Sequence, residues 1–295
     1  MATVEAIAAA LRECGHEAAL LGGGRTFLTN LLATPVDLVF NIAEGWNSRS
    51  REAQVPAVCE LLGVAYTHSE PLPLAISLDK AMTKRFAAAG GVRTPEFVCV
   101  DSMEEFEGAR LPAFPVLAKP ACEGSSMGIR THSRCENREE LRALVAALLG
   151  DYAGTVLIER YLPGVEVTVL VMGQAVAGMM EIAPRSGSAE AFVYSLEAKR
   201  DYANRVDYHV PPRLPEAVCR AIGETALRAY RAIGCRDIGR VDVRLDEAGE
   251  PSLIEVNPLP GLHPVEGDVP VLWDKMGRSY VELIRGIVDE AAVRV

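Results

Sequence analysis

The feature that most constrains the fold is a pair of apolar segments near the C-terminus, residues 238–245 (IGRVDVRL) and 251–257 (PSLIEVN). Apolar and polar residues alternate in both, which is the period of a β-strand. Only the turn-forming sequence DEAGE separates them, and a connection this short joins antiparallel neighbours. We therefore expect two adjacent antiparallel strands, which the rest of the chain must extend into a sheet.

Polar side chains lie at corresponding places on these two strands. Because residues two apart share one face of a strand, Arg240 and Asp242 point the same way, and so do Glu255 and Asn257. The pair would bring two carboxylates and an amide to one spot without histidine or cysteine. Such oxygen ligands suit Mg²⁺, which completes its shell with phosphates and water. A buried ion pair of Arg240 with Asp242 or Glu255 is the alternative, and the pattern leaves both open.

A second polar site is expected where a lysine ends an apolar strand. The segment 114–120 (FPVLAKP) predicts a strand carrying Lys119, and the loop that follows, 123–128, has the sequence EGSSMG. Glycines allow backbone N–H groups to point inward and serines add hydroxyl donors, so the loop is suited to cover a phosphate. It is not the GxxxxGK[ST] loop of other nucleotide-binding proteins. The candidate contacts are Lys119, Glu123, Gly124, Ser125, Ser126 and Gly128.

Lysine is scarce in this chain. Of 30 basic residues only five are lysines and 25 are arginines. The lysine ammonium is a compact point charge, so a tight site that faces a phosphate oxygen can require it where a planar guanidinium does not fit. Some lysines simply persist at the surface. Three of the five, however, lie inside sequence motifs: Lys80 in LDKAMTK, Lys119 in AKPACEGSSMG and Lys199 in EAK.

A third candidate site follows the segment 155–162 (TVLIERYL), which predicts another strand. Glu159 and Tyr161 share one face of it. The turn at 163–164 then allows Glu166 to return near them. Carboxylates at such a junction could bind the amino group and ribose hydroxyls of a nucleotide. A solvated hairpin is the alternative.

The remaining pattern alternates helices and strands, which indicates an α/β chain. Helical spacing predicts a first helix that Gly15 ends, and Ser77 is a candidate N-cap for a helix carrying Lys80. An antiparallel pair is expected to turn near residues 173–174. The other expected elements are strands at 16–21 and 37–43 and helices at 51–63, 215–233 and 279–293. We divide the chain into units 1–70, 71–160 and 161–295.

Charge and composition limit the partners. A net charge of −10 argues against nucleic acid or an anionic membrane as the main partner. No apolar run is long enough to span a membrane, and the first 20 residues lack the pattern of a signal peptide. Seven scattered cysteines without a CxxC pair indicate reduced thiols in a cytoplasmic protein. The expected partners are therefore small molecules.

The motifs occur in a specific order: LDKAMTK, AKPACEGSSMG, VLIERYLPGVEVTV, EAK, GRVDV and LIEVNPLPGL. In this order they resemble the ATP-grasp carboxylate–amine ligases, and within them the D-alanine–D-alanine ligase family. The resemblance implies an ATP-grasp fold, with ATP held between two antiparallel sheets behind a small N-terminal α/β domain. It also implies transfer of the γ-phosphate to a carboxylate, attack of an amine on the acyl phosphate, and a homodimer.

The resemblance also implies a role for each candidate residue. Lys80, Lys119 and Lys199 would contact the nucleotide phosphates under the loop from Gly124 to Gly128. For the base and ribose it implies Glu159, the backbone of Arg160, Tyr161 and Leu162, and Glu166. Asp242, Glu255 and Asn257 would hold two Mg²⁺ ions, with Mn²⁺ as a substitute. Arg240 and the Gly261 N–H would stabilise the tetrahedral oxyanion, and Ser125 is retained among the catalytic positions.

The chain departs from the family where substrates should bind. It opens on a helix, without the first strand and the glutamate that holds the donor's amino group, so we expect either a start further upstream or a lost contact. Arg200 follows EAK where the family has tyrosine. The loop after PGL is HPVEGD, with Glu266 and Asp268 in place of hydroxyls, which favours an acceptor bearing a cationic group. The alternatives are a ligase for a different amino acid or peptide, or an ATP-binding protein without turnover.

Overall fold

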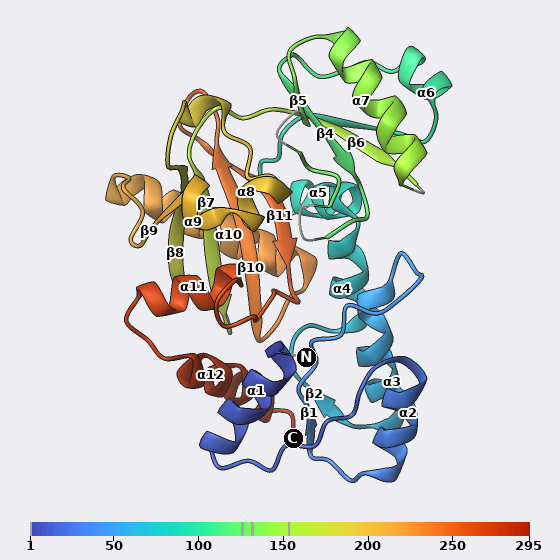
Figure 1. Cartoon of the computed structure of the whole chain (residues 1–295), viewed down its shortest axis with the longest axis vertical. Helices are drawn as coiled ribbons and strands as arrows, with labels where there is room; N and C mark the ends of the chain where they lie inside the picture. The colour runs from blue at the N-terminus through green and yellow to red at the C-terminus, as the bar shows by residue number, and fades with distance from the viewer. Residues whose placement is uncertain (1, 125–126, 131–132, 153) are drawn as a thin grey trace.

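The computed structural model describes residues 2–124, 127–130, 133–152 and 154–295. The candidate residues Ser125 and Ser126 lie outside the described part of the chain. Three sheets are present there, one of five strands, one of four and one of two. In Figure 1 the five-stranded sheet fills the centre, the four-stranded sheet lies above and beside it, and the N-terminal elements lie below.

The five-stranded sheet has the order β11–β10–β7–β8–β9 and is antiparallel throughout. Its strands are β7 (Glu166–Met172), β8 (Ala175–Pro184), β9 (Val206–His209), β10 (Ile238–Leu245) and β11 (Pro251–Asn257). The predicted pairing of β10 with β11 is confirmed, and Asp242 lies opposite Glu255 in its register. The hairpin from β7 to β8 also turns where expected, with Gly173 at a positive φ of 59°.

Both faces of this sheet are covered. Its helices are α10 (Glu216–Ile233) on one face, and α1 (Ala2–Glu13), α11 (Asp268–Lys275) and α12 (Tyr280–Ala292) on the other. Strand β7 shows the alternation, because Val167 and Val169 pack beneath α10 whereas Leu170 packs against α11 and α12. Two short helices, α8 (Leu196–Arg200) and α9 (Tyr202–Arg205), follow the turn η3 (Ala189–Ala191) and lie over β8 and β9.

The four-stranded sheet has the order β3–β6–β4–β5 and is also antiparallel. Its elements are β3 (Phe97–Val100), α6 (Met103–Gly108), β4 (Val116–Pro120), β5 (Arg134–Cys135), α7 (Arg138–Asp151) and β6 (Val156–Arg160). Val156 and Ile158 of β6 pack with α6 and α7 in one core. The residues that alternate with them, Leu157 and Glu159, therefore face the opposite side, toward the five-stranded sheet.

The N-terminal part departs most from expectation. Its elements are α2 (Gly24–Ala33), β1 (Leu38–Val39), η1 (Arg51–Ala53), α3 (Gln54–Leu62) and β2 (Ala65–Tyr66). The predicted strand at 16–21 is wrong, because these residues are irregular. The strand predicted over 37–43 shrinks to β1, which pairs in parallel with β2. Helix α3 ends at Gly63 in the left-handed conformation, as predicted.

The helix that carries Lys80 begins later than predicted. Ser77 lies inside α4 (Pro71–Leu78), and the N-cap of α5 (Lys80–Ala89) is Asp79. The Asp79 carboxylate accepts hydrogen bonds from the N–H groups of Ala81 and Met82, both at 3.0 Å. This cap places Lys80 at the first position of α5.

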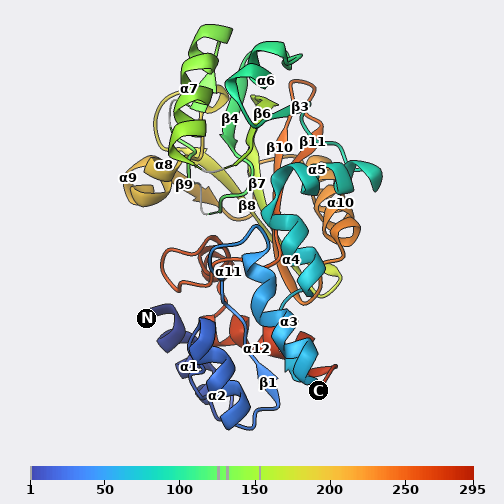
Figure 2. The same ribbon diagram turned by 90° about the vertical axis from the view of Figure 1, so that its right-hand side faces the viewer.

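Helices α4 and α5 pack on the five-stranded sheet, and α5 also contacts the four-stranded sheet, where Ala81 packs with Leu157 of β6. Ile76, Ala87 and Val92 belong to the core beneath α10. Figure 2 shows α4 running from the N-terminal helices up to α5 and α10. The core thus crosses the expected boundary at residue 160, and the division into three units stays a prediction. Among the described residues, no helix is both long and apolar enough to cross a membrane.

Candidate active site

A pocket lies where the two large sheets face each other. Nine of the residues expected to bind nucleotide or metal line it: Lys80, Lys119, Glu123, Gly124, Glu166, Lys199, Asp242, Glu255 and Asn257. They come from both sheets, from α5, from α8 and from the loop after β4. The sequence separates these groups by up to 177 positions, and the fold brings them together around one pocket.

Arg240 connects two carboxylates of the pocket lining, Asp242 and Glu255, to a third outside the lining, Asp268. Its guanidinium lies 2.9 Å from Asp242, 3.0 Å from Glu255 and 3.0 Å from Asp268. Thr168 donates a further hydrogen bond of 2.8 Å to Asp242. The predicted face of β10 and β11 is therefore confirmed. The ion pairs of Arg240 that are the alternative to metal binding are also present.

The pKa values of the two carboxylates in the ligand set, Asp242 and Glu255, are shifted in opposite directions. Burial and the nearby charge of Glu255 raise the pKa of Asp242 to about 7, although Arg240 opposes the shift. Burial would likewise raise the pKa of Glu255, but Lys80 and Arg240 lower it well below its usual range. One ionised and one readily protonated carboxylate lie side by side.

The same residues fit a divalent ion. Asn257 donates its amide N–H to Glu255 at 3.1 Å and to Asp242 at 3.5 Å. A half-turn of that amide presents its oxygen instead, giving three oxygen donors on one spot. In the described part of the chain, no group of three or more histidine, cysteine, aspartate or glutamate side chains could hold a metal. A set of two carboxylates and one amide suits Mg²⁺, which takes its other ligands from phosphate and water.

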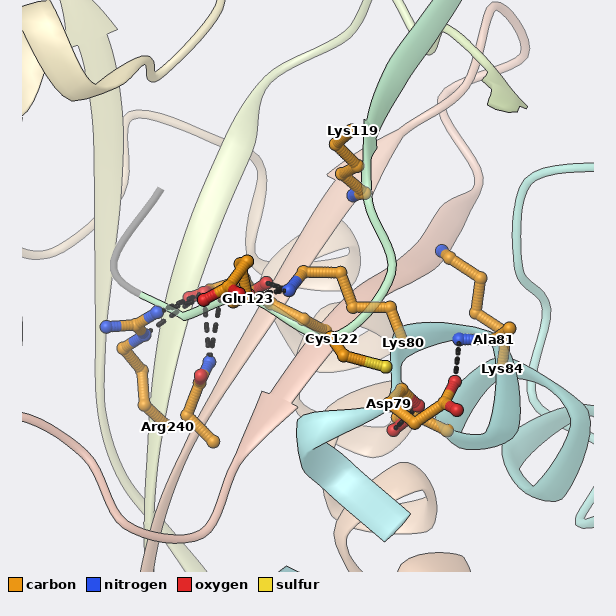
Figure 3. Close-up of polar contacts among 12 residues, drawn as sticks. Asp79, Lys80, Ala81, Lys84, Lys119, Cys122, Glu123 and Arg240 are labelled. Carbon is orange, nitrogen blue, oxygen red and sulfur yellow. Dashed lines mark hydrogen bonds and ion pairs between the residues drawn. The ribbon is translucent and has the colours of Figure 1, made fainter. Parts of the chain in front are cut away.

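Lys80 reaches this cluster from α5. Its ammonium lies 3.9 Å from Glu255 and donates a short hydrogen bond to the backbone oxygen of Glu123. Figure 3 shows Lys80 extending from Asp79 toward Glu123, with Arg240 approaching from the opposite side. Burial lowers the pKa of Lys80, while the charge of Glu255 opposes that shift. The lysine therefore links the start of the glycine loop to the metal-ligand candidates.

Glu159 forms a buried ion cluster. Its carboxylate lies 2.6 Å from the ammonium of Lys119 and 2.8 Å from that of Lys84. All three side chains are almost inaccessible, with exposed fractions of 4%, 2% and 0%. Burial alone would raise the pKa of Glu159, but the two ammonium groups lower it to about 2. Its contact with a base stays a prediction, since both carboxylate oxygens already face lysines.

The segment after β6 offers one backbone donor. The N–H of Arg160 donates to Glu96 and that of Tyr161 to Pro115, whereas the N–H of Leu162 has no partner among the described residues. The Tyr161 hydroxyl and the Glu166 carboxylate both bind Arg244, at 2.6 and 3.2 Å.

Lys199 and Arg240 share one counter-ion, Asp268, which we had expected to face the acceptor substrate. Lys199 lies 3.7 Å from Asp268 and over the ring of Tyr194, 4.6 Å from its centre. Asp268 also accepts a hydrogen bond of 2.9 Å from the Tyr194 hydroxyl, and only a tenth of its side chain is exposed. The acid that we expected to attract a cationic substrate thus already binds two cations of the protein, whereas Glu266 is exposed.

Two glycines from the candidate set lie outside the pocket lining. Gly261 is exposed, and a Cβ added there would meet no atom within 4 Å. Gly128 has a φ of 76°, and a Cβ there would lie 2.5 Å from the ring of Pro120. A glycine is therefore required at 128 for the loop to return past β4.

Sequence reasoning missed three residues of the site and gave a fourth another role. Glu52 and Tyr194 line the pocket and Lys84 binds Glu159, whereas Asp268, expected to face the acceptor, binds Arg240. Lys84 had a signal, because it lies four positions after Lys80 and is one of only five lysines. For the others no local pattern indicates the partner.

Comparison with known proteins gives a consistent result. The family described as D-ala D-ala ligase C-terminus matches residues 89–289. The chain is 35% identical to the D-alanine–D-alanine ligase of Bordetella petrii, covering 97% of this chain and 85% of that protein. It is also 35% identical to the enzyme of the same name from Gluconobacter oxydans, covering 98% and 93%. Two crystal structures of the Bacillus anthracis D-alanine–D-alanine ligase, one complexed with ATP, align with a TM-score of 0.77 at 22% identity, over 99% of this chain and 92% of theirs.

Proposed function

We propose that this chain, which belongs to the D-alanine–D-alanine ligase family, joins a carboxylate to an amine at the expense of ATP through an acyl phosphate. Its membership confirms the predicted ATP-grasp fold and the predicted class of C–N bond-forming ligase. The observation that carries the proposal is the convergence of nine predicted residues on one pocket between two antiparallel sheets.

The positive charges of the pocket suit the phosphates of ATP. Lys80 and Lys119 would contact them from α5 and β4, under the loop that begins at Gly124. Asp242, Glu255 and Asn257 would hold Mg²⁺, which neutralises phosphate oxygens when bound. The N–H of Leu162 donates to no described residue, which supports a contact with the base. The carboxylate of Glu166 lines the pocket, which supports a contact with the ribose.

The chain's own groups support the acyl-transfer step. Arg240 is held on three sides by carboxylates, so its guanidinium has a fixed direction and needs no reorganisation when negative charge develops nearby. The N–H of Gly261 would add a second donor for the oxyanion. Asp268 and the ring of Tyr194 hold Lys199, whose ammonium would contact the transferring phosphoryl group.

A ligase for a different amino acid or peptide is the second candidate. It is favoured by Asp268 and Glu266, which replace the hydroxyls of the family. Because Asp268 is paired with Arg240 and Lys199, a cationic acceptor would have to meet Glu266. We further propose a cytoplasmic homodimer, which light scattering on the purified protein would test. The seven cysteines, all within the described ranges, are free thiols.

The test is turnover with Mg²⁺-ATP and a panel of D- and L-amino acids, reading ADP, phosphate and the product's mass. We expect stoichiometric ADP and dipeptide with at least one pair. Glu255→Gln should abolish product while leaving the fold intact by circular dichroism, because it removes one of only two carboxylates in the ligand set. ADP formation at the normal rate in that variant would refute the metal assignment. An absence of ADP with every carboxylate would favour the ATP-binding protein without turnover.

A further inference from the structure

Arg244 is a buried arginine on the face of β10 that carries the metal-ligand candidates. Val243 packs in the core beneath α10, so Arg244 points to the opposite side, the side of Asp242. In the register of β10 with β7, Arg244 lies opposite Glu166, which lines the pocket. Only 7% of the Arg244 side chain is exposed. A buried cation therefore lies next to an acid of the pocket lining.

The guanidinium of Arg244 donates to four acceptors. Its Nε donates to the backbone oxygen of Gly164 at 3.1 Å, and one terminal nitrogen donates to Glu166 at 3.2 Å. The other terminal nitrogen donates to the Tyr161 hydroxyl at 2.6 Å and to the backbone oxygen of Phe192 at 2.9 Å. A lysine has its three donors on a single atom, whereas arginine spreads its donors over a planar fork. The contacts therefore require an arginine.

Three of these acceptors belong to one segment, residues 161–166, which leads from the end of β6 to the start of β7. Within this segment the Tyr161 ring lies near two guanidinium groups, 4.6 Å from that of Arg244 and 4.8 Å from that of Arg134. The segment also contains Leu162, whose N–H donates to no described residue. Arg244 thus holds at three points the segment that carries both expected contacts to the base and the ribose.

Glu166 is held through one of its two carboxylate oxygens. Arg244 binds Oε2, and Oε1 accepts no hydrogen bond from any described residue. A carboxylate fixed through one oxygen keeps the other available as an acceptor. Because Glu166 lines the pocket, a bound ligand with hydroxyl donors can use it.

From these contacts we infer that Arg244 is a positioning residue for the nucleotide, which orients Glu166 toward the ribose hydroxyls. The inference rests on the proposed function, in which ATP is the co-substrate. Arg244 touches no reacting group and acts through Glu166 and the segment 161–166. Its removal should therefore change how strongly a nucleotide binds and how much that binding depends on the ribose hydroxyls, and should change kcat less.

The experiment measures binding and turnover separately. Calorimetry with Mg²⁺ compares ADP with 2′,3′-dideoxy-ADP, which lacks both ribose hydroxyls and is otherwise the same molecule. Turnover is read in parallel with Mg²⁺-ATP, a panel of amino acids and hydroxylamine as the acceptor, so that an activated carboxylate appears as a hydroxamate. The variant Arg244→Met keeps an unbranched apolar side chain on β10 and removes the guanidinium.

For the wild type we expect ADP to bind roughly tenfold more tightly than the dideoxy nucleotide, the range of a charge-assisted hydrogen bond. In Arg244→Met this ratio should fall toward one, and the KM for ATP should rise by a larger factor than kcat falls. Glu166→Ala should lose the same ratio, and the double variant should lose no more, because both changes act on one contact. Arg244→Lys should recover little of the ratio, because an ammonium does not replace the fork.

Arg294→Met is the matched control. Arg294 also binds a buried carboxylate through two nitrogens, that of Asp237 at 2.6 and 2.7 Å, and donates to the backbone oxygen of Tyr66 at 3.1 Å. It does not line the pocket. This variant should melt at a lower temperature than the wild type and keep the wild-type ratio of the two nucleotide affinities. A loss of stability alone therefore does not produce the result expected for Arg244→Met.

Two results overturn the inference. One is equal binding of both nucleotides by the wild type, and the other is a preference for ADP that survives in a folded Arg244→Met protein. If Arg244→Met does not fold, an undiminished preference in Arg244→Lys has the same meaning.

Hydroxamate formation separates these results from failure of the proposed function. A ribose preference that depends on Arg244, in a protein that forms no hydroxamate with any amino acid, would sustain the positioning role and contradict the ligase. Hydroxamate formation with a preference that Arg244→Met leaves intact would sustain the ligase and overturn the inference.

Discussion

Replacing Glu159 with glutamine should destabilise the protein strongly. The carboxylate lies within 2.8 Å of two ammonium groups, those of Lys119 and Lys84, and all three side chains are buried. Glutamine would leave the two positive charges facing each other without their nearest counter-ion. Breaking a buried pair in this way costs about 3–5 kcal/mol. At roughly 2–4 °C per kcal/mol for a chain of this size, the melting temperature should fall by roughly 6–20 °C.

The matched control is Glu107→Gln. Glu107 also binds two cations, Arg138 and Arg142, at 3.1 and 2.7 Å, but its side chain is 48% exposed. Water screens an exposed pair, so this variant should melt with the wild type. Differential scanning calorimetry of the three proteins at pH 7 makes the comparison.

The pH dependence gives a second reading of the Glu159 cluster. Burial lowers the pKa of Lys84, and the negative charge of Glu159 opposes that shift. Without Glu159 the folded state should release this proton more easily than the unfolded chain, so folding gains relative stability as pH rises toward the unfolded value near 10.4. The deficit of Glu159→Gln should therefore shrink between pH 7 and pH 10. A variant that melts with the wild type at pH 7 and only raises the KM for ATP would refute the counter-ion role and favour the base contact.

Two further predictions concern His68 and Asp268. Burial lowers the pKa of His68 to about 3, so below about pH 6.5 the unfolded chain binds a proton that the folded chain does not. The free energy of unfolding of the wild type, relative to that of His68→Asn, should therefore fall by about 1.4 kcal/mol per pH unit between pH 6 and pH 4. Urea titrations would measure this difference, and a difference that stays constant with pH would contradict the prediction. Asparagine suits the site because His68 has a φ of 71°. Asp268→Asn removes the shared counter-ion of Arg240 and Lys199. It should lower kcat by roughly tenfold or more and leave the KM for ATP unchanged. An unaltered kcat would show that Asp268 does not position these two residues.

The convergence of Arg240, Asp242, Glu255 and Asn257 could be predicted because it depends on two local facts, the period of a strand and a short turn. The chain itself fixes which residues face each other when neighbouring strands are joined directly. The hairpin of β7 and β8 was predictable for the same reason. The long helix α10 was predictable because Pro215 marks its start.

Errors arose where a local pattern had more than one solution. Residues 16–21 are apolar enough for a strand, but a strand also needs a partner, and the described structure provides none there. Ser77 and Asp79 are both good N-caps, and the choice depends on where α4 ends. The partners of Lys84 and Asp268 lie 75 and 28 positions away in sequence, so only the folded chain reveals these pairs.

The position of Lys84 has a mechanical consequence. Its ammonium binds Glu159 on β6 at 2.8 Å and the backbone oxygen of Leu253 on β11 at 3.3 Å, so one buried side chain joins both large sheets. Sheets that keep these two contacts cannot slide or separate at this corner. A motion that widens the pocket while both contacts persist has small displacements near Lys84 and larger ones at the far rim.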